Sequence, residues 1–319
     1  MVKIAVVGAT GLVGKTFLKE AQRLQLPFDE MILFASPASE GKVLQVDNFS
    51  AKIHALSDKI FEKGKVADIV FFCAGSEISE RYVTKFLHTG SVVIDNSSRF
   101  RMEKDVPLVA VEVNFDKVGD SKLIANPNCS TLTAIPALNA LKPFGLQKVR
   151  YVTFQSASGA GRRGLQFFKD GNADFFGGEL KTNCIPKIGD FDCLGNTQEE
   201  LKMQAETKKI LQLPYLDVSA TCVRVPIEYC HAVAVEVELK KDFCVAEILS
   251  AFEKQANLKV AKGLPLTQEV KDKEYSVVGR IRKTGERELS FFCVADNLCK
   301  GASSNAILIA KKIIKGEKF

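Results

Sequence analysis

The residues with the clearest chemical potential lie in the segment 126–131, which reads NPNCST. A helix is predicted over 130–141, bent by Pro136 and ended before Pro143. Cys129 then sits at the mouth of a helix, where unpaired N–H groups and a partial positive charge favour a nucleophilic thiolate. The alternative is that Cys129, one of nine cysteines, is simply a small core residue. Other segments of the sequence distinguish a nucleophilic Cys129 from a core cysteine.

A glycine-rich loop near the N-terminus has the composition of a dinucleotide-binding turn. The sequence GATGLVG occupies 8–14, after an apolar strand predicted over 3–7 and at the start of an amphipathic helix over 12–24. In this setting backbone N–H groups approach a pyrophosphate at the helix N-terminus. Glycine spacing alone would be weak evidence, and the strand-loop-helix context is what makes the prediction of nucleotide binding strong.

The order of predicted elements indicates an α/β fold with two domains. Further strands are predicted over 31–35, 68–73, 92–95 and 123–125, with helices between them such as 79–87. This alternation is typical of a doubly wound, Rossmann-like parallel sheet.

After Lys148 the strands lengthen and alternate apolar with polar residues, as at 233–239. Two more, 276–282 and 287–294, flank the turn Thr284-Gly285-Glu286, which indicates an antiparallel or mixed sheet. An amphipathic helix over 298–314 is expected to return to the nucleotide domain. We predict a nucleotide domain of residues 1–128 plus 297–319 and an α+β domain of residues 129–296.

Composition excludes several classes of protein. The 319 residues are 46% hydrophobic and 26% charged, an ordinary globular balance, and no apolar run is long enough to span a membrane. Nine cysteines without a CxxC pair, in a chain that begins directly with a strand, predict reduced thiols in the cytoplasm and no metal site. The net charge of +6 is scattered, which argues against nucleic acid and suits a small anionic ligand.

A cysteine nucleophile beside a nicotinamide needs a proton carrier, and histidine suits neutral pH. Of the three histidines, His54 lies in a polar connection and His88 at a helix end. His231 opens a strand seven residues after Arg224, so by elimination it is the best candidate.

Several charged residues are candidate ligands for an anionic substrate. Arg224 sits among apolar residues, an expensive place for a charge without a partner. Arg99 and Arg101 follow the strand 92–95 at the carboxyl edge of the sheet, where surface charge is the alternative explanation. Glu199 and Lys202 share a helix face and could be an ordinary surface ion pair.

The end of the second strand bears on the choice of cofactor. An NAD site would place an acid there to hold the ribose 2′-hydroxyl, but the nearest one, Glu40, follows the turn. Ser36, Ser39 and Lys42 could instead hold a 2′-phosphate, which favours NADP over NAD.

Taken together, these segments resemble aspartate-semialdehyde dehydrogenase of the bacterial type over essentially the whole chain. The resemblance rests on seven segments in order: GATG with VG at 8–14, DNSS at 95–98, NPNCST at 126–131, QSASGAG at 155–161, QAET at 204–207, RVP at 224–226 followed by His231, and DNL at 296–298 with KGA at 300–302. It implies NADPH-dependent reduction of L-aspartyl 4-phosphate to L-aspartate 4-semialdehyde, a step toward lysine, threonine, methionine and diaminopimelate. It also implies a homodimer or a pair of dimers.

The resemblance assigns roles to individual residues. By it, Cys129 carries the acyl-thioester beside Asn128, His231 is the acid/base, and Gln155 orients the acyl group. Arg224 would bind the substrate carboxylate and Glu199 its amine, while Arg101 and Lys202 would bind phosphate, with Arg99 as the alternative to Arg101. The residues implied to line the cofactor are Gly8, Thr10, Gly11, Leu12, Val13, Ser36, Ser39, Ser158, Gly159 and Asn297.

One departure from the family affects the cofactor. Where the family often has Arg-Ser after the second strand, this chain has Ala38-Ser39. Either Lys42 compensates for the missing arginine, or NAD is accepted as well as NADP.

Three other functions would also account for parts of this sequence. N-acetyl-glutamyl-phosphate reductase shares the chemistry, but Glu199 suits a free ammonium rather than an acetylated amine. A short-chain epimerase or reductase needs Tyr-x-x-x-Lys, and none of the five tyrosines has lysine four residues later. An inactive nucleotide-binding or redox-sensing paralogue need not keep Cys129, Gln155, Arg224 and His231 together.

Overall fold

The computed structural model describes residues 1–62 and 64–316, and the chain divides into two compact units. The terminal unit comprises residues 1–127 together with the C-terminal segment that begins at Ala302. The central unit comprises Asn128–Gly301. None of the helices in the described residues combines the length and hydrophobicity that a bilayer crossing demands.

The terminal unit is built on a seven-stranded sheet in the order β3-β4-β2-β1-β5-β6-β7. All pairs are parallel except β3 with β4. The strands are β1 (Lys3–Val7), β2 (Glu30–Ala35), β3 (Val43–Val46), β4 (Phe49–Ala55), β5 (Ile69–Phe72), β6 (Val92–Asp95) and β7 (Leu123–Ala125). The helices are α1 (Leu12–Arg23), α2 (Ser76–His88), α3 (Val111–Asn114) and α8 (Ser304–Ile314). The predicted parallel sheet is confirmed.

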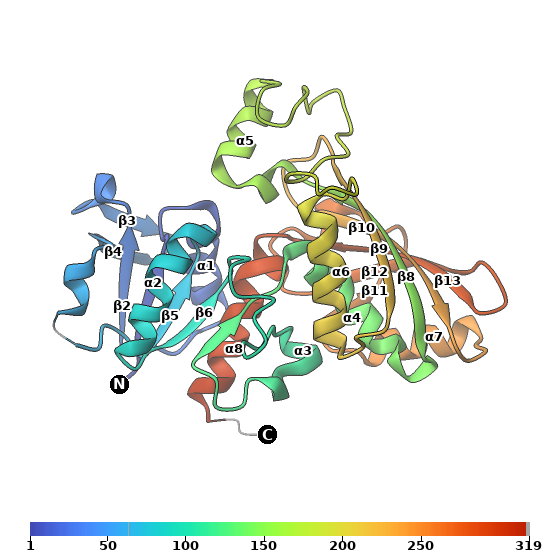
Figure 1. Ribbon diagram of the computed structural model, residues 1–319, viewed down its shortest axis with the longest axis horizontal. Coiled ribbons are helices and arrows are strands. Elements are labelled where there is room, and N and C mark those ends of the chain that lie inside the picture. The colour runs from blue at the N-terminus through green and yellow to red at the C-terminus, as the bar shows by residue number, and fades with distance from the viewer. Residues whose placement is uncertain (63, 317–319) are drawn as a thin grey trace. The chain divides into compact units, whose positions relative to one another are not determined.

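Alternate residues of β1 enter two different cores, as a sheet covered on both faces requires. Ile4 and Val6 join the cluster that includes Phe17 of α1 and Ile307 of α8. Ala5 and Val7 join the cluster that includes Phe86 of α2. Figure 1 shows α1 and α2 beside the strands β5 and β6 of the same sheet.

The hairpin of β3 and β4 was not predicted, and the placement of His54 in a connection was wrong. His54 belongs to β4, which pairs with β2. Of the seven residues of β4 only Ile53 is buried, so the sequence shows little of the alternation that marks a strand.

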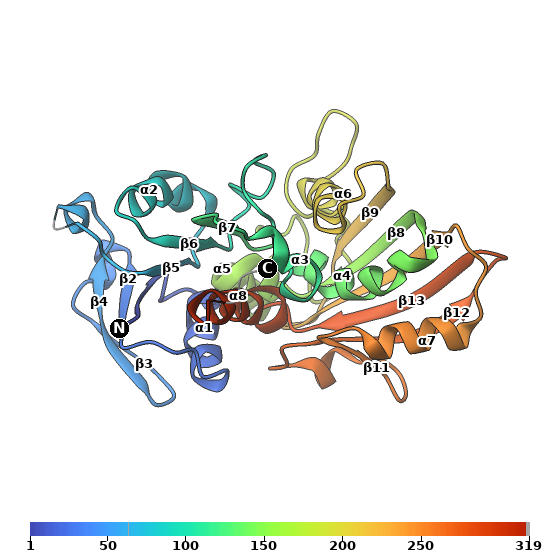
Figure 2. The ribbon, with the colours of Figure 1, turned by 90° about the horizontal axis from the view of Figure 1, so that it is seen from below.

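The central unit is built on a six-stranded mixed sheet in the order β11-β12-β13-β10-β8-β9, as predicted in kind. Its strands are β8 (Leu146–Gln155), β9 (Asp217–Arg224), β10 (His231–Leu239), β11 (Leu258–Val260), β12 (Ser276–Lys283) and β13 (Glu288–Ala295). Its helices are α4 (Cys129–Leu141), α5 (Gly161–Asp170), α6 (Gln198–Leu211) and α7 (Val245–Lys254). Helix α4 packs against β8, β10, β12 and β13, α6 against β9, and α7 against β11 and β12 (Figure 2).

Helix α4 matches its predicted span to within one residue and contains Pro136. Proline has no N–H, so the carbonyl of Leu132 loses its usual donor within the helix. The hydroxyl of Ser276 on β12 donates to that carbonyl at 3.4 Å. A tertiary contact thus replaces the missing bond, and the helix tolerates its proline.

The C-terminal helix differs from the prediction at its start. A π-helical turn over Cys299–Ser303 precedes α8, whereas one helix from 298 was expected. The carboxylate of Asp296 accepts the N–H groups of Leu298 and Cys299, both at 2.9 Å, and so sets the start of this turn. The turn brings Gly301 against Cys129, where an added Cβ would lie 2.7 Å from the Cys129 Cβ.

Candidate active site

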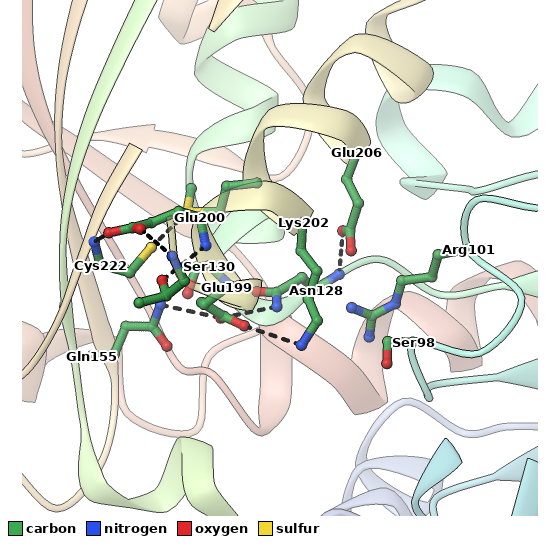
Figure 3. Close-up of polar contacts among 12 residues, drawn as sticks. Ser98, Arg101, Asn128, Ser130, Gln155, Glu199, Glu200, Lys202, Glu206 and Cys222 are labelled. Carbon is green, nitrogen blue, oxygen red and sulfur yellow. Dashed lines mark hydrogen bonds and ion pairs between the residues drawn. The ribbon is translucent and has the colours of Figure 1, made fainter. Parts of the chain in front are cut away.

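Asn128 holds Cys129 in place at the start of α4. As the N-cap, its Oδ1 accepts the N–H of Ser130 at 2.8 Å. Its Nδ2 donates to Glu199 Oε1 at 2.9 Å, and its backbone N–H donates to Glu206 Oε2 at 2.7 Å (Figure 3). Two carboxylates of α6 therefore fix the residue before the nucleophile candidate.

Sequence reasoning gave Glu206 no role. Glu199, Lys202 and Glu206 are spaced at i, i+3 and i+7 on α6, so they share a face, and this spacing was the available signal. Lys202 Nζ lies 3.5 Å from Glu199 Oε2, which confirms the expected pair. Glu199 and Glu206 are nevertheless almost completely buried, so they are not ordinary surface charges.

Strand register brings three candidate side chains to one end of the mixed sheet. Gln155 ends β8 opposite Arg224, which ends the parallel strand β9. His231 begins β10, which runs antiparallel to β8, so it lies at the same end. The Nε2 group of Gln155 donates to Glu199 Oε1 at 3.2 Å, which ties this sheet end to the N-cap of α4.

His231 is fully buried with one ring nitrogen bonded and the other not. Its Nδ1 accepts the backbone N–H of Ser156 at 3.1 Å. A neutral imidazole whose Nδ1 accepts carries its proton on Nε2. That Nε2 is buried and has no hydrogen-bond partner among the described residues. Such a donor is costly unless a ligand supplies an acceptor, by about 1–3 kcal/mol.

The electrostatics keep His231 neutral, and Arg224 forms no ion pair among the described residues. Burial, with a smaller effect from Arg224, lowers the pKa of His231 to about 3. Arg224 is 5% exposed, and its Nη1 donates to the carbonyl of Ser156 at 2.7 Å. Within the described residues it forms no ion pair, and burial lowers its pKa while the charges of Glu199 and Cys129 oppose that shift. A buried guanidinium in this state is suited to an anionic ligand.

Asn297 anchors the chain before His231. Its Oδ1 accepts the N–H of Cys230 at 2.9 Å and the hydroxyls of Ser156 and Ser158 at 3.3 and 3.2 Å. Ser158 and Asn297 were expected to line the cofactor. Their bonds also give them a part in positioning His231.

Gly159 leaves room for the two functional side chains. A Cβ added there would lie 2.8 Å from Arg224 Nη1 and 2.9 Å from His231 Cε1. Real carbon atoms do not approach so closely, so any side chain at this position would displace Arg224, His231 or both.

In the terminal unit, the glycine-rich loop has the geometry of an anion-binding turn. Gly8 has φ +83°, and its N–H donates to the carbonyl of Phe34 at 2.9 Å. Gly11 is the N-cap of α1, and Leu12 and Val13 begin the helix. The first turn of α1 holds no acidic side chain, so its N–H groups and dipole suit a phosphate.

A cavity of about 620 Å³ opens next to this loop. It is lined by Val7, Gly8, Ala35, Ser36, Pro37, Leu56, Ser57, Asp58, Lys59, Ala74, Ile78, Arg81 and Tyr82. Ser36 lies in this lining, whereas Ser39 and Lys42 are absent from it. Sequence reasoning missed Asp58, Lys59 and Arg81, because the cavity wall that carries Asp58 and Lys59 follows the unpredicted strand β4.

The two arginines after β6 have different surroundings. Arg99 pairs with Glu80 at 3.2 Å and with Glu103 at 2.8 Å on an exposed surface. Arg101 is 7% exposed, and its guanidinium donates to the carbonyls of Asn126 at 2.9 Å and Asn96 at 2.7 Å. These bonds hold the buried Arg101 guanidinium in place, whereas the side chain of Arg99 is engaged by two exposed carboxylates.

Comparisons with known proteins agree with this arrangement. Residues 3–121 match the family described as semialdehyde dehydrogenase, NAD binding domain, and residues 136–300 match semialdehyde dehydrogenase, dimerisation domain. Aspartate-semialdehyde dehydrogenase of Aquifex aeolicus is 39% identical over 341 residues, covering 98% of each chain. The crystal structure of aspartate semialdehyde dehydrogenase II from Vibrio cholerae superposes with a TM-score of 0.92 at 34% identity, covering 99% of each chain.

A Rossmann-like unit joined to a mixed-sheet unit with a helix-capped cysteine defines the semialdehyde dehydrogenase class. Within that class, aspartate-semialdehyde dehydrogenases from three bacteria match nearly the full length of this chain at 36–39% identity. The chain belongs to the aspartate-semialdehyde dehydrogenase family.

Gly159→Ala should lower kcat/KM about a hundredfold, because displacing a catalytic group by about 1 Å has effects of that size. Steady-state kinetics check the rate, and thermal unfolding checks that the protein still folds. Gly178→Ala is the matched control, since a Cβ there meets only the Ile185 side chain at 3.7 Å. Wild-type kinetics in the Gly159 variant would show that the close approach is not required.

The pH dependence of kcat/KM should show no ionisation of His231 between about pH 5 and 8. That parameter reports the free enzyme, in which the pKa of His231 is near 3. Nitrogen NMR of the imidazole should show a neutral ring protonated at Nε2 over this range. A ring that titrates near its ordinary pKa of 6.5 would contradict the described burial.

The same shift predicts a dependence of folding stability on pH. The unfolded chain takes up a proton at His231 as the pH falls through 6.5, while the folded protein does not until about pH 3. The neutral His231 ring therefore costs no stability above pH 6.5. As the pH falls from 6.5 toward 3, the free energy of unfolding decreases, because only the unfolded chain takes up this proton. Urea unfolding of wild-type and His231→Gln at two pH values measures the difference.

Proposed function

We propose that this protein reduces L-aspartyl 4-phosphate to L-aspartate 4-semialdehyde with NADPH and releases phosphate. One observation carries the proposal. The buried Arg224 guanidinium has no ion pair, and the buried His231 Nε2 has no acceptor, among the described residues, and both lie against Gly159. Together they form a site suited to a ligand that brings both a carboxylate and an oxygen acceptor.

The nucleophile in this proposal is Cys129. Its sulfur, at the N-terminus of α4, attacks the acyl carbon of the substrate, the carbon–oxygen bond to phosphate breaks, and phosphate leaves. The product of this step is a thioester on Cys129. NADPH, when bound, supplies the hydride that reduces the acyl carbon.

His231 is the proposed proton carrier. Its Nε2–H donates to the oxygen of the reduced acyl group, and the fixed bond from Ser156 N–H to Nδ1 orients the ring for this. As the carbonyl double bond re-forms, this proton returns to Nε2 and the carbon–sulfur bond breaks, which releases the aldehyde and restores the thiolate. Gln155 is the proposed partner that orients the acyl group.

The remaining substrate contacts follow from charge. Arg224 binds the substrate carboxylate in this proposal, because it is buried and forms no ion pair among the described residues. Glu199 binds the ammonium, while Lys202 and Arg101 bind phosphate. A carboxylate at position 199 disfavours an acetylated amine, the group that distinguishes the substrate of N-acetyl-glutamyl-phosphate reductase.

The two units divide the work in this proposal. The terminal unit binds NADP(H) through Gly8, Gly11 and the start of α1, and the central unit carries the chemistry. The product serves lysine, threonine, methionine and diaminopimelate synthesis in the cytoplasm. All nine cysteines are free, which agrees with a reducing compartment.

We propose a homodimer, or a pair of such dimers, whose interface forms on the sheet of the central unit. A shallow cavity of about 360 Å³ lies on this sheet. Val152 and Phe292 flank Ala234 across neighbouring strands there, and Val152 is 41% exposed. The family match over 136–300 is described as a dimerisation domain, and an exposed apolar row on a sheet face is the kind of surface that pairs with a copy of itself.

Cys129→Ser should abolish the phosphate-dependent oxidation of aspartate semialdehyde while NADP binding stays unchanged. A serine hydroxyl lacks the nucleophilicity of a thiolate, so the loss should exceed about a thousandfold. The assay follows absorbance of the reduced nicotinamide, and NADP binding is measured by calorimetry. Retained turnover would exclude Cys129 as the nucleophile.

Val152→Glu should shift the protein toward monomer, because it places a charge in the apolar row of the proposed interface. Light scattering after size-exclusion chromatography measures the mass. Leu264→Glu is the matched control, since Leu264 is 62% exposed but lies outside this cavity lining. An unchanged mass for the Val152 variant would place the interface elsewhere.

A further inference from the structure

The turn after β2 brings no cation to the cavity of the terminal unit. The turn after β2 supplies Ser36, Pro37 and Ala38, none of which carries a charge. Lys42 lies beyond the described lining, and its carbonyl accepts the N–H of Ile53 at 2.8 Å next to the β3–β4 hairpin. A 2′-phosphate in this cavity therefore needs cations from another element.

Two cations from other elements of the lining meet that need. Lys59 belongs to the short helix Asp58–Phe61, and Arg81 lies on α2. Both line the cavity. Lys59 forms no ion pair with any residue that the structure describes. The Arg81 guanidinium lies over the Tyr82 ring, 5.0 Å from its centroid, which holds the side chain at the cavity wall.

The one carboxylate in the lining, Asp58, does not neutralise this pair. Lys85 Nζ lies 2.5 Å from Asp58 Oδ1, whereas the closest Arg81 nitrogen is 3.7 Å from Oδ2, beyond hydrogen-bond distance. The bond to Lys85 is also the main cause of the lowered pKa of Asp58. Lys85 therefore takes up most of this carboxylate's charge, and the donors of Arg81 and Lys59 remain available to an anion.

The rest of the lining suits an adenine ring. Leu56, Ala74 and Ile78 provide apolar surface, and Ser36 and Ser57 provide hydroxyls. An apolar pocket with a few convergent polar groups is the usual form of a nucleotide site. The cavity also begins at Gly8, whose loop precedes the N-terminus of α1.

We propose that Lys59 and Arg81 recognise the 2′-phosphate of NADP(H) in this chain. The inference rests on the proposed function for the identity of the ligand. It assigns the cofactor preference to two elements, the short helix after β4 and α2, rather than to the turn after β2. Arg81 supplies a planar pair of donors, and Lys59 a point charge.

The test uses the intact chain and two small probes, 2′,5′-ADP and 5′-AMP, which differ by the 2′-phosphate alone. Wild-type protein should bind 2′,5′-ADP more tightly than 5′-AMP in calorimetric titrations. The double variant Lys59→Met with Arg81→Leu should lose about ten- to a hundredfold in affinity for 2′,5′-ADP, the scale of one or two charge-assisted hydrogen bonds. Its affinity for 5′-AMP should stay unchanged.

Two further variants sharpen the result. Lys117→Met removes an exposed lysine that pairs only with the neighbouring Asp116 at 3.1 Å, so it should alter neither affinity. Lys42→Met tests the competing anchor. The proposal is overturned if Lys42→Met carries the selective loss, if the double variant loses both probes equally, or if wild-type protein does not prefer 2′,5′-ADP.

Kinetics separate this inference from the proposed function. In the semialdehyde assay the double variant should raise KM for NADP and leave KM for NAD unchanged. If wild-type protein shows no semialdehyde activity but the probe titrations behave as expected, the proposed reaction fails and the assignment of Lys59 and Arg81 stands. If activity is present and the probes show no selectivity, the proposed reaction stands and the assignment of Lys59 and Arg81 fails.

Discussion

The central unit depends on how Asn128 is held. Its side-chain oxygen caps α4, its amide donates to Glu199, and its backbone N–H donates to Glu206. The two bonds from Asn128 to Glu199 and Glu206 have buried carboxylates as acceptors, so these two are charge-assisted and resist displacement. The position of Cys129 is thus set by α6, a helix some seventy residues later in the sequence, and not by its own loop alone.

Strand register supplies the second part of the arrangement. Gln155, Arg224 and His231 come from three strands whose pairing places their ends together. One residue of slippage in any of these strands would turn the functional side chain to the other face of the sheet. Gln155 then joins the two parts, because it bonds to the same Glu199 oxygen as Asn128 does.

Short-range sequence patterns predicted much of the fold and several residues of the candidate site. The glycine loop, the span of α4, the parallel sheet and the start of β10 at His231 all follow from short-range signals in the sequence. The strand β4 was missed because only Ile53 of its residues is buried. The cavity cations Lys59 and Arg81 could not be found for a related reason, since tertiary packing after β4 and along α2 brings them together. Glu206 left a signal at i+7 from Glu199, but helical spacing alone does not distinguish a buried carboxylate from an exposed one.

The burial of α4 also affects how the protein unfolds. Nearly every residue from Ser130 to Leu138 is buried, and Ser276 secures the one carbonyl that Pro136 leaves without a donor. Helices of this kind open to solvent only with the largest cooperative unit of a domain, so their amides exchange hydrogen slowest. Cys129, the proposed nucleophile, is the first residue of this helix. Its surroundings should therefore persist until the core of the central unit melts, and loss of catalytic geometry and loss of the fold would be a single event.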